Sequence, residues 1–217
     1  MNILLLGATG RTGKHALAYA LEKGHQVSIL VRNPERIAPQ PNLLIFEGDP
    51  ANRIDLQRAM EGCRAVISVL NISRTSDFPW AALRTPKTFL SNAMHKVIGL
   101  AKQNNIKRLV FCSAWGVEDS RKEIPFWFRW TIDYSNIKYA YLDHGRQEEL
   151  VTQSGLDYTI VRPVGLTDFN KKLSITQSEH NLPKPNLLIS RKAVALFMVD
   201  CLFTTEAQGK TITISNT

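Results

Sequence analysis

The sequence predicts an α/β protein with one doubly wound, mostly parallel sheet of about seven strands and helices on both faces. Three observations predict it. A short apolar run at the N-terminus leads through closely spaced glycines into a helical pattern. Apolar runs of strand length then alternate with helical stretches along the rest of the chain. No repeat, low-complexity tract or linker divides the 217 residues, so we expect residues 1–217 to form a single domain.

The first strand, turn and helix predict a Rossmann-type dinucleotide site. The apolar run 3–6 stops at Gly7, and Gly10 and Gly13 follow before a helix that Gly24 ends. One glycine allows a sharp turn, one lets the backbone approach a pyrophosphate at the helix N-terminus, and one lets the helix pack closely on the strand. In the alternative interpretation the glycines serve packing alone. The turn residues expected to bind the dinucleotide are Gly7, Thr9, Gly10, Arg11, Thr12 and Gly13.

The remaining elements alternate in the same way. Further strands are expected at 27–31, 43–46, 65–70, 108–113, 158–161 and 210–214. Helices are expected at about 52–61, 87–104, 134–153 and 190–203. The looser segments 72–86, 114–133 and 166–186 each follow the C-terminal end of a strand, where open α/β sheets bind ligands. We therefore expect these three loops to form the walls of a substrate site.

Composition narrows the class of function. The formal charge is +8, but Lys and Arg are spread along the chain, which favours anionic small molecules over nucleic acid as partners. No apolar run approaches the ~20 residues that span a bilayer, and the N-terminus lacks the features of a signal peptide. Cys63, Cys112 and Cys201 have no metal-ligand spacing, which indicates reduced thiols and no metal site. We expect a cytoplasmic monomer or homodimer without stable membrane association.

The ends of the next strands indicate which dinucleotide binds. Arg32 stands where sites for the unphosphorylated dinucleotide usually carry Asp or Glu. A guanidinium there can bind a 2′-phosphate through two hydrogen bonds, so the sequence favours NADPH, and Arg11 and Arg36 could add charge. In the alternative interpretation Arg32 is a solvated strand-end residue. Asp49, after the third strand, could accept from the adenine amino group, and Leu70, after the fourth, should run beside the cofactor.

Motifs along nearly the whole chain match those of one family. They are Gly7-Ala8-Thr9-Gly10-Arg11-Thr12-Gly13, Leu30-Val31-Arg32, Gly48-Asp49, Cys112-Ser113-Ala114, Asp143-His144-Gly145-Arg146, Ser154-Gly155-Leu156-Asp157-Tyr158, Arg162-Pro163, Ile189-Ser190 and Phe197-Met198. On these motifs the chain resembles the atypical short-chain dehydrogenases/reductases, in particular the NAD(P)H-binding branch that contains flavin reductase (biliverdin-IXβ reductase) and NmrA-like relatives. The resemblance implies NADPH binding, with Pro163 beside the cofactor, and hydride transfer to flavins or linear tetrapyrroles. Related chains include epimerases and non-catalytic redox sensors, so the resemblance leaves the substrate open.

Ser113 and His144 are the candidate catalytic residues. Ser113 ends the fifth strand, and its hydroxyl can hydrogen-bond a substrate carbonyl or position the nicotinamide carboxamide, as the resemblance also implies. His144 matches a histidine of the flavin-reductase branch and could bind substrate or relay a proton. The alternatives are a serine that caps a turn and a structural histidine. Val164 stands where the family tends to carry a histidine, which puts a two-histidine mechanism in doubt.

Tyr134 and Lys138 match the Tyr-x-x-x-Lys pair of many short-chain dehydrogenases, in which the lysine lowers the pKa of the tyrosine. Counting back from the turn at 154–156 places these two positions at Ala140 and His144 instead. The difference of six helical residues is about 9 Å. We therefore expect Tyr134 and Lys138 to lie away from the site.

The segment between Ser113 and His144 is enlarged and contains four aromatic residues within 126–130. These residues could form a stacking lid over a planar ligand, anchor the segment to the core, or make a dimer contact. Trp80 and Trp115 could join the same wall.

Together these features predict an NADPH-dependent oxidoreductase that transfers hydride to a conjugated planar acceptor, such as a flavin, a quinone or a tetrapyrrole-like compound. Charge on such an acceptor is delocalised and water can supply the proton, so the chemistry tolerates the missing tyrosine acid. One alternative is an NmrA-like redox sensor that binds NADP(H) without turnover. A second is a nucleotide-sugar epimerase or dehydratase, which would need Tyr134 to be catalytic.

Overall fold

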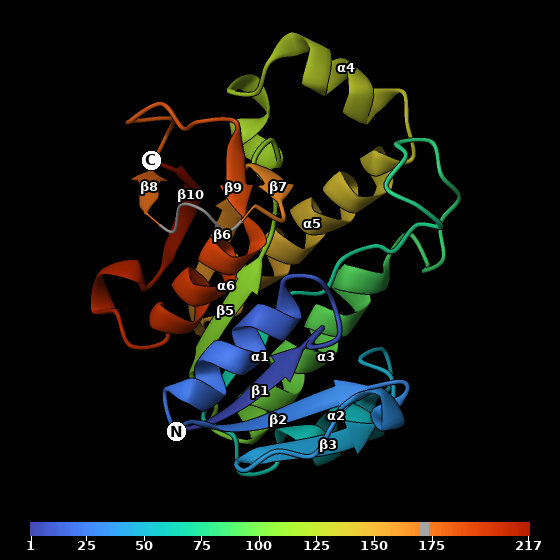
Figure 1. Cartoon of the computed structure of the whole chain (residues 1–217), viewed down its shortest axis with the longest axis vertical. Helices are drawn as coiled ribbons and strands as arrows, with labels where there is room; N and C mark the ends of the chain where they lie inside the picture. Colours follow the sequence, from blue (N-terminus) through green and yellow to red (C-terminus); the bar gives the residue numbers. More distant parts are fainter. Residues whose placement is uncertain (170–173) are drawn as a thin grey trace.

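The computed structural model describes residues 1–169 and 174–217, and its centre is a mostly parallel sheet (Figure 1). The sheet order is β3 (Leu43–Glu47), β2 (Gln26–Val31), β1 (Asn2–Leu6), β4 (Ala65–Ser68), β5 (Arg108–Cys112), β6 (Asp157–Pro163), β10 (Lys210–Asn216) and β8 (Ile175–Ser178). Each neighbouring pair is parallel except β10 and β8, which are antiparallel. The predicted fold class is confirmed, with eight strands in place of about seven.

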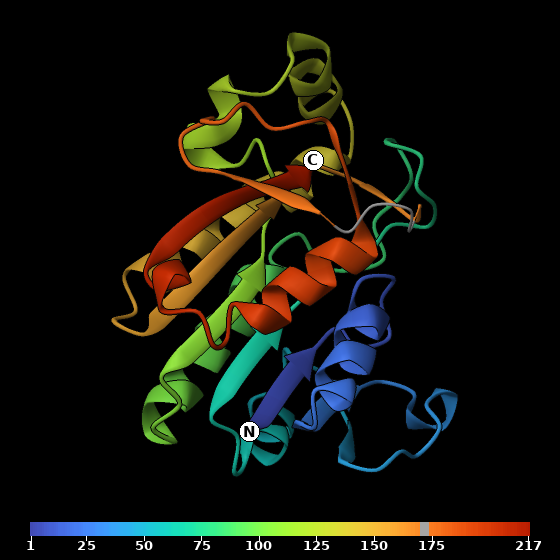
Figure 2. The same cartoon turned by 60° about the vertical axis from the view of Figure 1, so that its left-hand side comes forward.

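Helices cover both faces of the sheet, as predicted (Figure 2). One face carries α1 (Gly13–Glu22) and α6 (Arg191–Asp200), and the other carries α2 (Arg53–Met60), α3 (Phe89–Gln103) and α5 (Ile137–Thr152). In β1, Ile3 and Leu5 pack against the first group and Leu4 and Leu6 against the second, because successive side chains point to opposite faces. A strand that is buried on both faces reads as a continuous apolar run, which is why β1 was visible in the sequence.

Two of the predicted loops contain regular structure. Segment 114–133 holds the short 3-10 helix η2 (Glu118–Lys122) and the helix α4 (Phe126–Asp133). Segment 166–186 holds β8 and part of β7 (Gly165–Thr167), which pairs with β9 (Leu188–Ser190), while residues 170–173 lie outside the described residues. The sequence did not signal these elements, because α4 consists largely of aromatic and β-branched residues after a proline, and three of the four residues of β8 are polar. The other short helices are η1 (Pro34–Arg36) and η3 (Thr205–Ala207).

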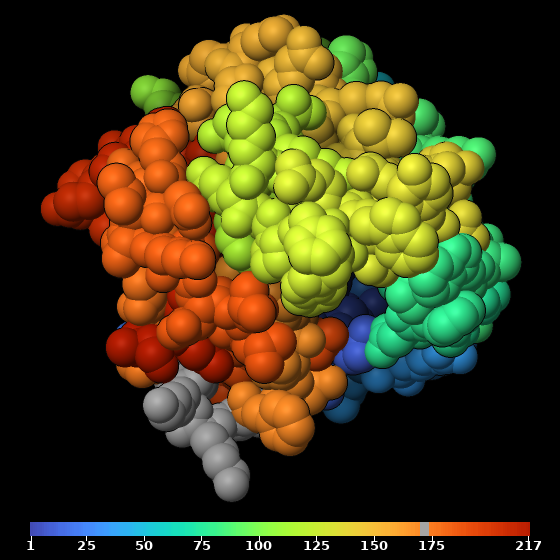
Figure 3. All heavy atoms as spheres, turned by 90° about the horizontal axis from the view of Figure 1, so that it is seen from above, coloured from blue at the N-terminus to red at the C-terminus, as the bar shows by residue number. Residues whose placement is uncertain are grey.

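The C-terminal edge of the sheet forms the floor of a hollow. Figure 3 looks down on this edge: the N-terminal segment, in dark blue, is visible between α4, in yellow-green, and segment 72–86, in teal. Loops after β1, β4 and β5 meet here because the parallel strands all end at the same edge. Across residues 1–169 and 174–217, no helix has the length and apolar character needed to cross a membrane.

Candidate functional site

A cleft of about 750 Å³ lies at the C-terminal edge of the sheet. It is lined by both predicted catalytic residues and by every predicted dinucleotide-binding residue except Gly13. We call its two ends the turn half, which contains Gly7, Gly10, Arg32 and Asp49, and the Ser113 half, which contains Ser113, Tyr141 and His144. The sequence thus identified most of the wall of one cavity, although the chemical roles of these residues stay predictions.

The glycines of the first turn have different structural roles. Gly7 has φ +85°, a left-handed conformation that favours glycine, and its carbonyl accepts the N–H of Gly10 at 2.9 Å. A Cβ atom on Gly13 would stand 2.0 Å from the Gly7 carbonyl oxygen, so Gly13 serves the packing of α1 against the turn. Gly10, in contrast, lines the cleft. The expectation that one glycine serves packing and another opens the backbone to a ligand fits this geometry.

Arg11 lines the cleft, but acidic residues compensate its charge. Its guanidinium donates to both carboxylate oxygens of Asp77, at 2.9 and 2.7 Å, and lies 3.9 Å from Asp168. The hydrogen bond from Arg11 lowers the pKa of Asp77, as expected for an ion pair. Arg11 therefore ties the glycine turn to segment 72–86, and the expectation that it adds free positive charge for the cofactor needs this correction.

Arg32 and Asp49 lie together in the turn half, at the ends of β2 and β3. Within the described part of the chain, the Arg32 side chain has no hydrogen-bond or ion-pair partner. The Oδ1 atom of Asp49 accepts the N–H of Ala51 at 2.7 Å, which holds the carboxylate in a tight turn. A positive group and an oriented carboxylate are thus placed where a phosphorylated adenosine would need them.

In the Ser113 half, the Ser113 hydroxyl is bound to a buried ion pair. Ser113 Oγ donates to Glu148 Oε1 at 2.5 Å, and Arg162 donates to both oxygens of Glu148, at 3.0 and 2.6 Å. A carboxylate that faces a guanidinium in this way accepts and cannot donate, so the serine proton points at Glu148. Ser113 therefore offers only lone pairs to the cleft.

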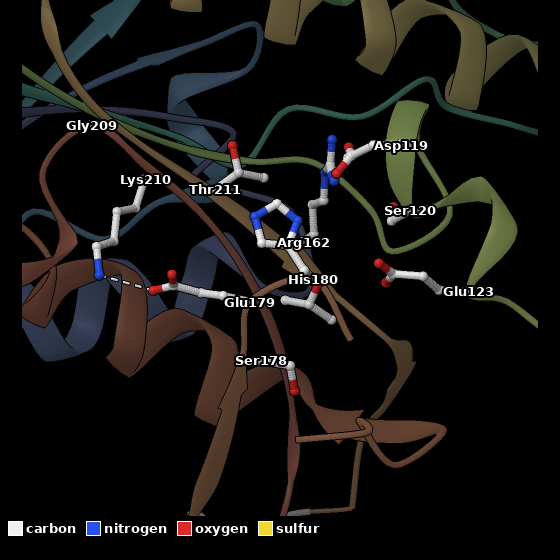
Figure 4. A pocket seen from close by; sticks show the side chains of 11 residues that line it. Asp119, Ser120, Glu123, Arg162, Ser178, Glu179, His180, Gly209, Lys210 and Thr211 are labelled. Carbon is white, nitrogen blue, oxygen red and sulfur yellow. Dashed lines mark hydrogen bonds and ion pairs between the residues drawn. The ribbon is translucent and has the colours of Figure 1, made fainter. Parts of the chain in front are cut away.

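Arg162 also connects this site to a second, smaller cavity. Its Nη1 donates to Asp119 at 2.7 Å, and Figure 4 shows the two groups side by side. This polar cavity of about 310 Å³ lies among η2, β6, β8 and β10. Burial by itself lowers the pKa of Arg162, but its contacts with Glu148 and Asp119 raise it on balance. The guanidinium thus stays charged between Glu148 and Asp119.

Tyr141 was missed by the sequence analysis and lines the same half of the cleft. Its hydroxyl donates to the carbonyl oxygen of Trp115 at 3.3 Å, and burial raises its pKa. The sequence could have indicated Tyr141, because it directly follows Ala140, which the helix register had placed at the site.

His144 lies one helical turn from Ala140 and is buried. Its Nδ1 is 3.3 Å from Oε1 of Gln147, and in the tautomer that bonds this oxygen Nδ1 carries the proton and Nε2 keeps a lone pair. Burial lowers the pKa of His144, which keeps the ring neutral. In that tautomer His144, like Ser113 and Tyr141, directs its proton toward the protein.

Asp143, from the same motif, serves the structure. Its carboxylate accepts the backbone N–H groups of Leu90 and Ser91, at 2.7 and 3.4 Å, and the hydroxyl of Ser91 at 2.5 Å. These groups form the first turn of α3, whose free N–H donors need acceptors. Asp143 therefore fixes α5 against α3 and so sets the position of His144.

Tyr134 and Lys138 do not line the cleft. Tyr134 is 65% exposed, and its carbonyl oxygen accepts the indole N–H of Trp80 at 2.7 Å. The Lys138 ammonium lies 5.3 Å from the ring centre of Tyr139. The structure thus separates the Tyr-x-x-x-Lys match from the site, as the register predicted.

The aromatic segment divides between the cleft and the surface. Phe128 lines the cleft and meets Tyr141 edge-on, with ring centres 6.4 Å apart, and Trp115 lines it too. The other aromatic side chains of α4 and of segment 72–86 are exposed: Phe78, Trp80, Phe126, Trp127 and Trp130. A four-residue stacking lid is therefore wrong for this structure, and one ring from α4 contributes to the wall.

Comparison with known proteins agrees with this geometry. A family model described as NAD(P)H-binding matches residues 7–205. The photosystem II assembly factor Ycf39 of Trieres chinensis is 28% identical over 186 residues, covering 82% of this chain and 56% of that protein. The corresponding protein of Cyanophora paradoxa is covered to 46%, so the chain spans about half the length of the curated relatives it matches.

Solved structures share the fold at lower identity. A short-chain dehydrogenase/reductase from Veillonella parvula, in complex with NADP, has a TM-score of 0.80 and 20% identity, with 99% of this chain and 94% of that chain covered. ChuY, described as an anaerobillin reductase from Escherichia coli O157:H7, has a TM-score of 0.81 and 20% identity, with 99% and 97% covered. These likenesses confirm the Rossmann-type α/β fold. Because the family model spans most of the sequence, the chain belongs to the NAD(P)H-binding family, and its cofactor class is NAD(P)H.

Proposed function

We propose that this protein is an NADPH-dependent oxidoreductase that transfers hydride to a conjugated planar acceptor, such as a flavin, a quinone or a tetrapyrrole-like compound. One observation carries the proposal. Ser113, Tyr141 and His144 direct their protons to Glu148, Trp115 and Gln147, respectively. In this arrangement none of the three side chains has a proton left for a bound acceptor.

The absence of a proton donor among these three side chains favours one kind of acceptor. Reduction of an isolated carbonyl places negative charge on one oxygen, which an acid in the site must neutralise. A conjugated ring system spreads the charge, and water can supply the proton, so the site has only to align the two partners. When bound, the reduced nicotinamide supplies the hydride. The rings of Phe128 and Trp115 offer apolar walls for a flat molecule.

The residues of the turn half are suited to binding a phosphorylated dinucleotide. In the described residues, the backbone N–H groups of Arg11 and Thr12 donate to no backbone acceptor, so they are free to bind a pyrophosphate at the start of α1. Arg32 would bind the 2′-phosphate and Asp49 the adenine amino group, while Leu70 and Pro163 would border the ring systems. The NADP complex of the Veillonella parvula protein supports this choice of cofactor.

The test is oxidation of NADPH, followed by its absorbance, with a panel of flavins, quinones, biliverdin and simple aldehydes and ketones. We expect turnover with at least one conjugated acceptor and none with the simple carbonyl compounds. Ser113→Ala should lower that turnover by roughly tenfold to a hundredfold, because the serine positions a reactant and does not carry the hydride. Preferred reduction of an aldehyde or ketone would contradict the proposal.

A binding protein without turnover is the second candidate, and the relatives named as assembly factors favour it. Tight NADPH binding with no oxidation by any acceptor in the panel would select it. The epimerase or dehydratase alternative has lost its support, because Tyr134 lies on the surface and outside the cleft.

A further inference from the structure

Arg74 is a cation in the cleft wall that the site described above does not use. It lies on segment 72–86, whose backbone it fixes through a bridge to Leu83, and its side chain is half-buried. Its Nε is buried without a hydrogen-bond partner, and across residues 1–169 and 174–217 its guanidinium makes no ion pair. Burial lowers the pKa of Arg74, which reports the cost of keeping this charge away from water.

Neighbouring acidic groups compensate this charge only in part. Asp77 is the carboxylate that acts electrostatically on Arg74, but both of its oxygens are bound by Arg11. Another cleft arginine, Arg191, has its partner in Asp168, at 3.0 Å. A partly buried cation without a bonded counter-ion is costly, and a guanidinium with free N–H groups is suited to a carboxylate or phosphate.

We infer that Arg74 binds an anionic group, a carboxylate or a phosphate, on the ligand held in the cleft. The topology places it between the two halves: its segment follows β4, which lies between β1 with the glycine turn and β5 with Ser113. The anion can therefore belong to the acceptor or to the cofactor. The assignment to the acceptor rests on the proposed function, whereas the assignment to the phosphates of the cofactor rests on the family alone.

The experiment uses two flavins that share one ring system. FMN carries a phosphate and riboflavin does not, so the ratio of their dissociation constants, measured by quenching of flavin fluorescence, reports the anion alone. NADPH affinity is measured separately by calorimetry. The variant is Arg74→Gln, and the matched control is Arg84→Gln, an exposed arginine on the same segment that lies outside the cleft.

If the acceptor supplies the anion, Arg74→Gln weakens the binding of FMN by about tenfold relative to that of riboflavin and leaves the affinity for NADPH unchanged. If the cofactor supplies the anion, the affinity for NADPH falls by a similar factor and the ratio of the FMN and riboflavin dissociation constants stays constant. Arg74→Lys should keep part of either effect, and the melting temperature of Arg74→Gln should not fall, because the charge has no protein partner to lose.

The inference is overturned if the FMN-to-riboflavin ratio and the NADPH affinity of Arg74→Gln both stay within twofold of Arg84→Gln. A lowered melting temperature with unchanged affinities would equally overturn it, since Arg74 would then serve the structure. All readouts are binding measurements, so a protein that reduces no acceptor still tests the inference. If the wild type binds neither flavin, the NADPH measurement decides alone.

Discussion

The hydrogen bonds that shape the turn half of the cleft join residues close in the sequence, whereas the bond beneath Ser113 joins residues far apart. Gly10 bonds to Gly7, and Asp49 bonds to Ala51. Ser113, in contrast, bonds to Glu148, thirty-five positions along the chain. Each turn of the first half thus follows from local geometry, although the turns meet only because β1, β2 and β3 are neighbours in the sheet. The contact between Ser113 and Glu148 exists only once β5, β6 and α5 have packed together. Substitutions in the turn half should therefore affect ligand binding, and those beneath Ser113 should also affect stability.

The largest expected effect is on dinucleotide binding. Gly10→Val places a branched side chain in the cleft where a pyrophosphate would approach the backbone, and should weaken NADPH binding on the order of 100-fold or more. Calorimetric titration measures it, with the melting temperature as a check of folding. Gly13→Ala is the contrast, because its Cβ would strike the Gly7 carbonyl and should destabilise the fold instead. Retained NADPH binding by a folded Gly10→Val protein would mean that the cofactor lies elsewhere.

The next effect concerns stability in the Ser113 half. Glu148→Ala leaves Arg162 buried without its main partner, and should lower the free energy of unfolding by about 3–5 kcal/mol. Denaturant titration checks this, and the control is Glu149→Ala, because Glu149 is the exposed neighbour on the same helix. Equal stabilities of the two variants would show that the buried pair does not support this half.

A third prediction separates NADPH from NADH. Arg32→Ala should weaken the binding of NADPH by about 1.5–3 kcal/mol, since one charge-assisted contact is lost, and should leave the binding of NADH unchanged. The control is Arg36→Ala, because Arg36 lies on η1 and outside the cleft. If the wild type bound both dinucleotides equally, or if Arg32→Ala kept the wild-type ratio, Arg32 would have no part in choosing the cofactor.

Sequence reasoning identified the turn half well because each of its residues follows a recognisable strand end. Arg32 and Asp49 needed only the positions of β2 and β3, which their apolar runs supplied. The pairing of Arg11 with Asp77 spans sixty-six positions, and no local pattern signals it. The same holds for Glu148 beneath Ser113 and for Arg74. Such contacts depend on how loops close over the sheet, which spacing along one chain does not specify.

A smaller effect is expected for the pH dependence of stability. Burial lowers the pKa of His144 below its usual value in the folded state. As the pH falls below about 6.5, the unfolded chain binds a proton at this position before the folded chain does, so stability is lost as the pH falls toward the folded pKa. In His144→Gln this part of the loss should disappear, up to about 1.4 kcal/mol per pH unit in that window.

Unfolding curves at several pH values measure the difference between His144→Gln and the wild type. His95→Gln, at an exposed position on α3, controls for loss of a histidine as such. The account of His144 as a buried neutral ring would be contradicted by wild type and His144→Gln losing stability in parallel over that range.

The central claim is that the Ser113 half aligns the reactants and donates no proton. The most direct measurement is the pH dependence of kcat/KM for an acceptor that does not itself ionise between about pH 6 and 9, at saturating NADPH. The account predicts a flat profile, and it predicts that Tyr141→Phe keeps kcat/KM within a few-fold of the wild-type value, because the tyrosine hydroxyl is bound to the Trp115 carbonyl. A loss of kcat/KM of about a hundredfold or more in Tyr141→Phe at neutral pH, where burial keeps the tyrosine protonated, would show that this tyrosine acts as an acid and would contradict the claim.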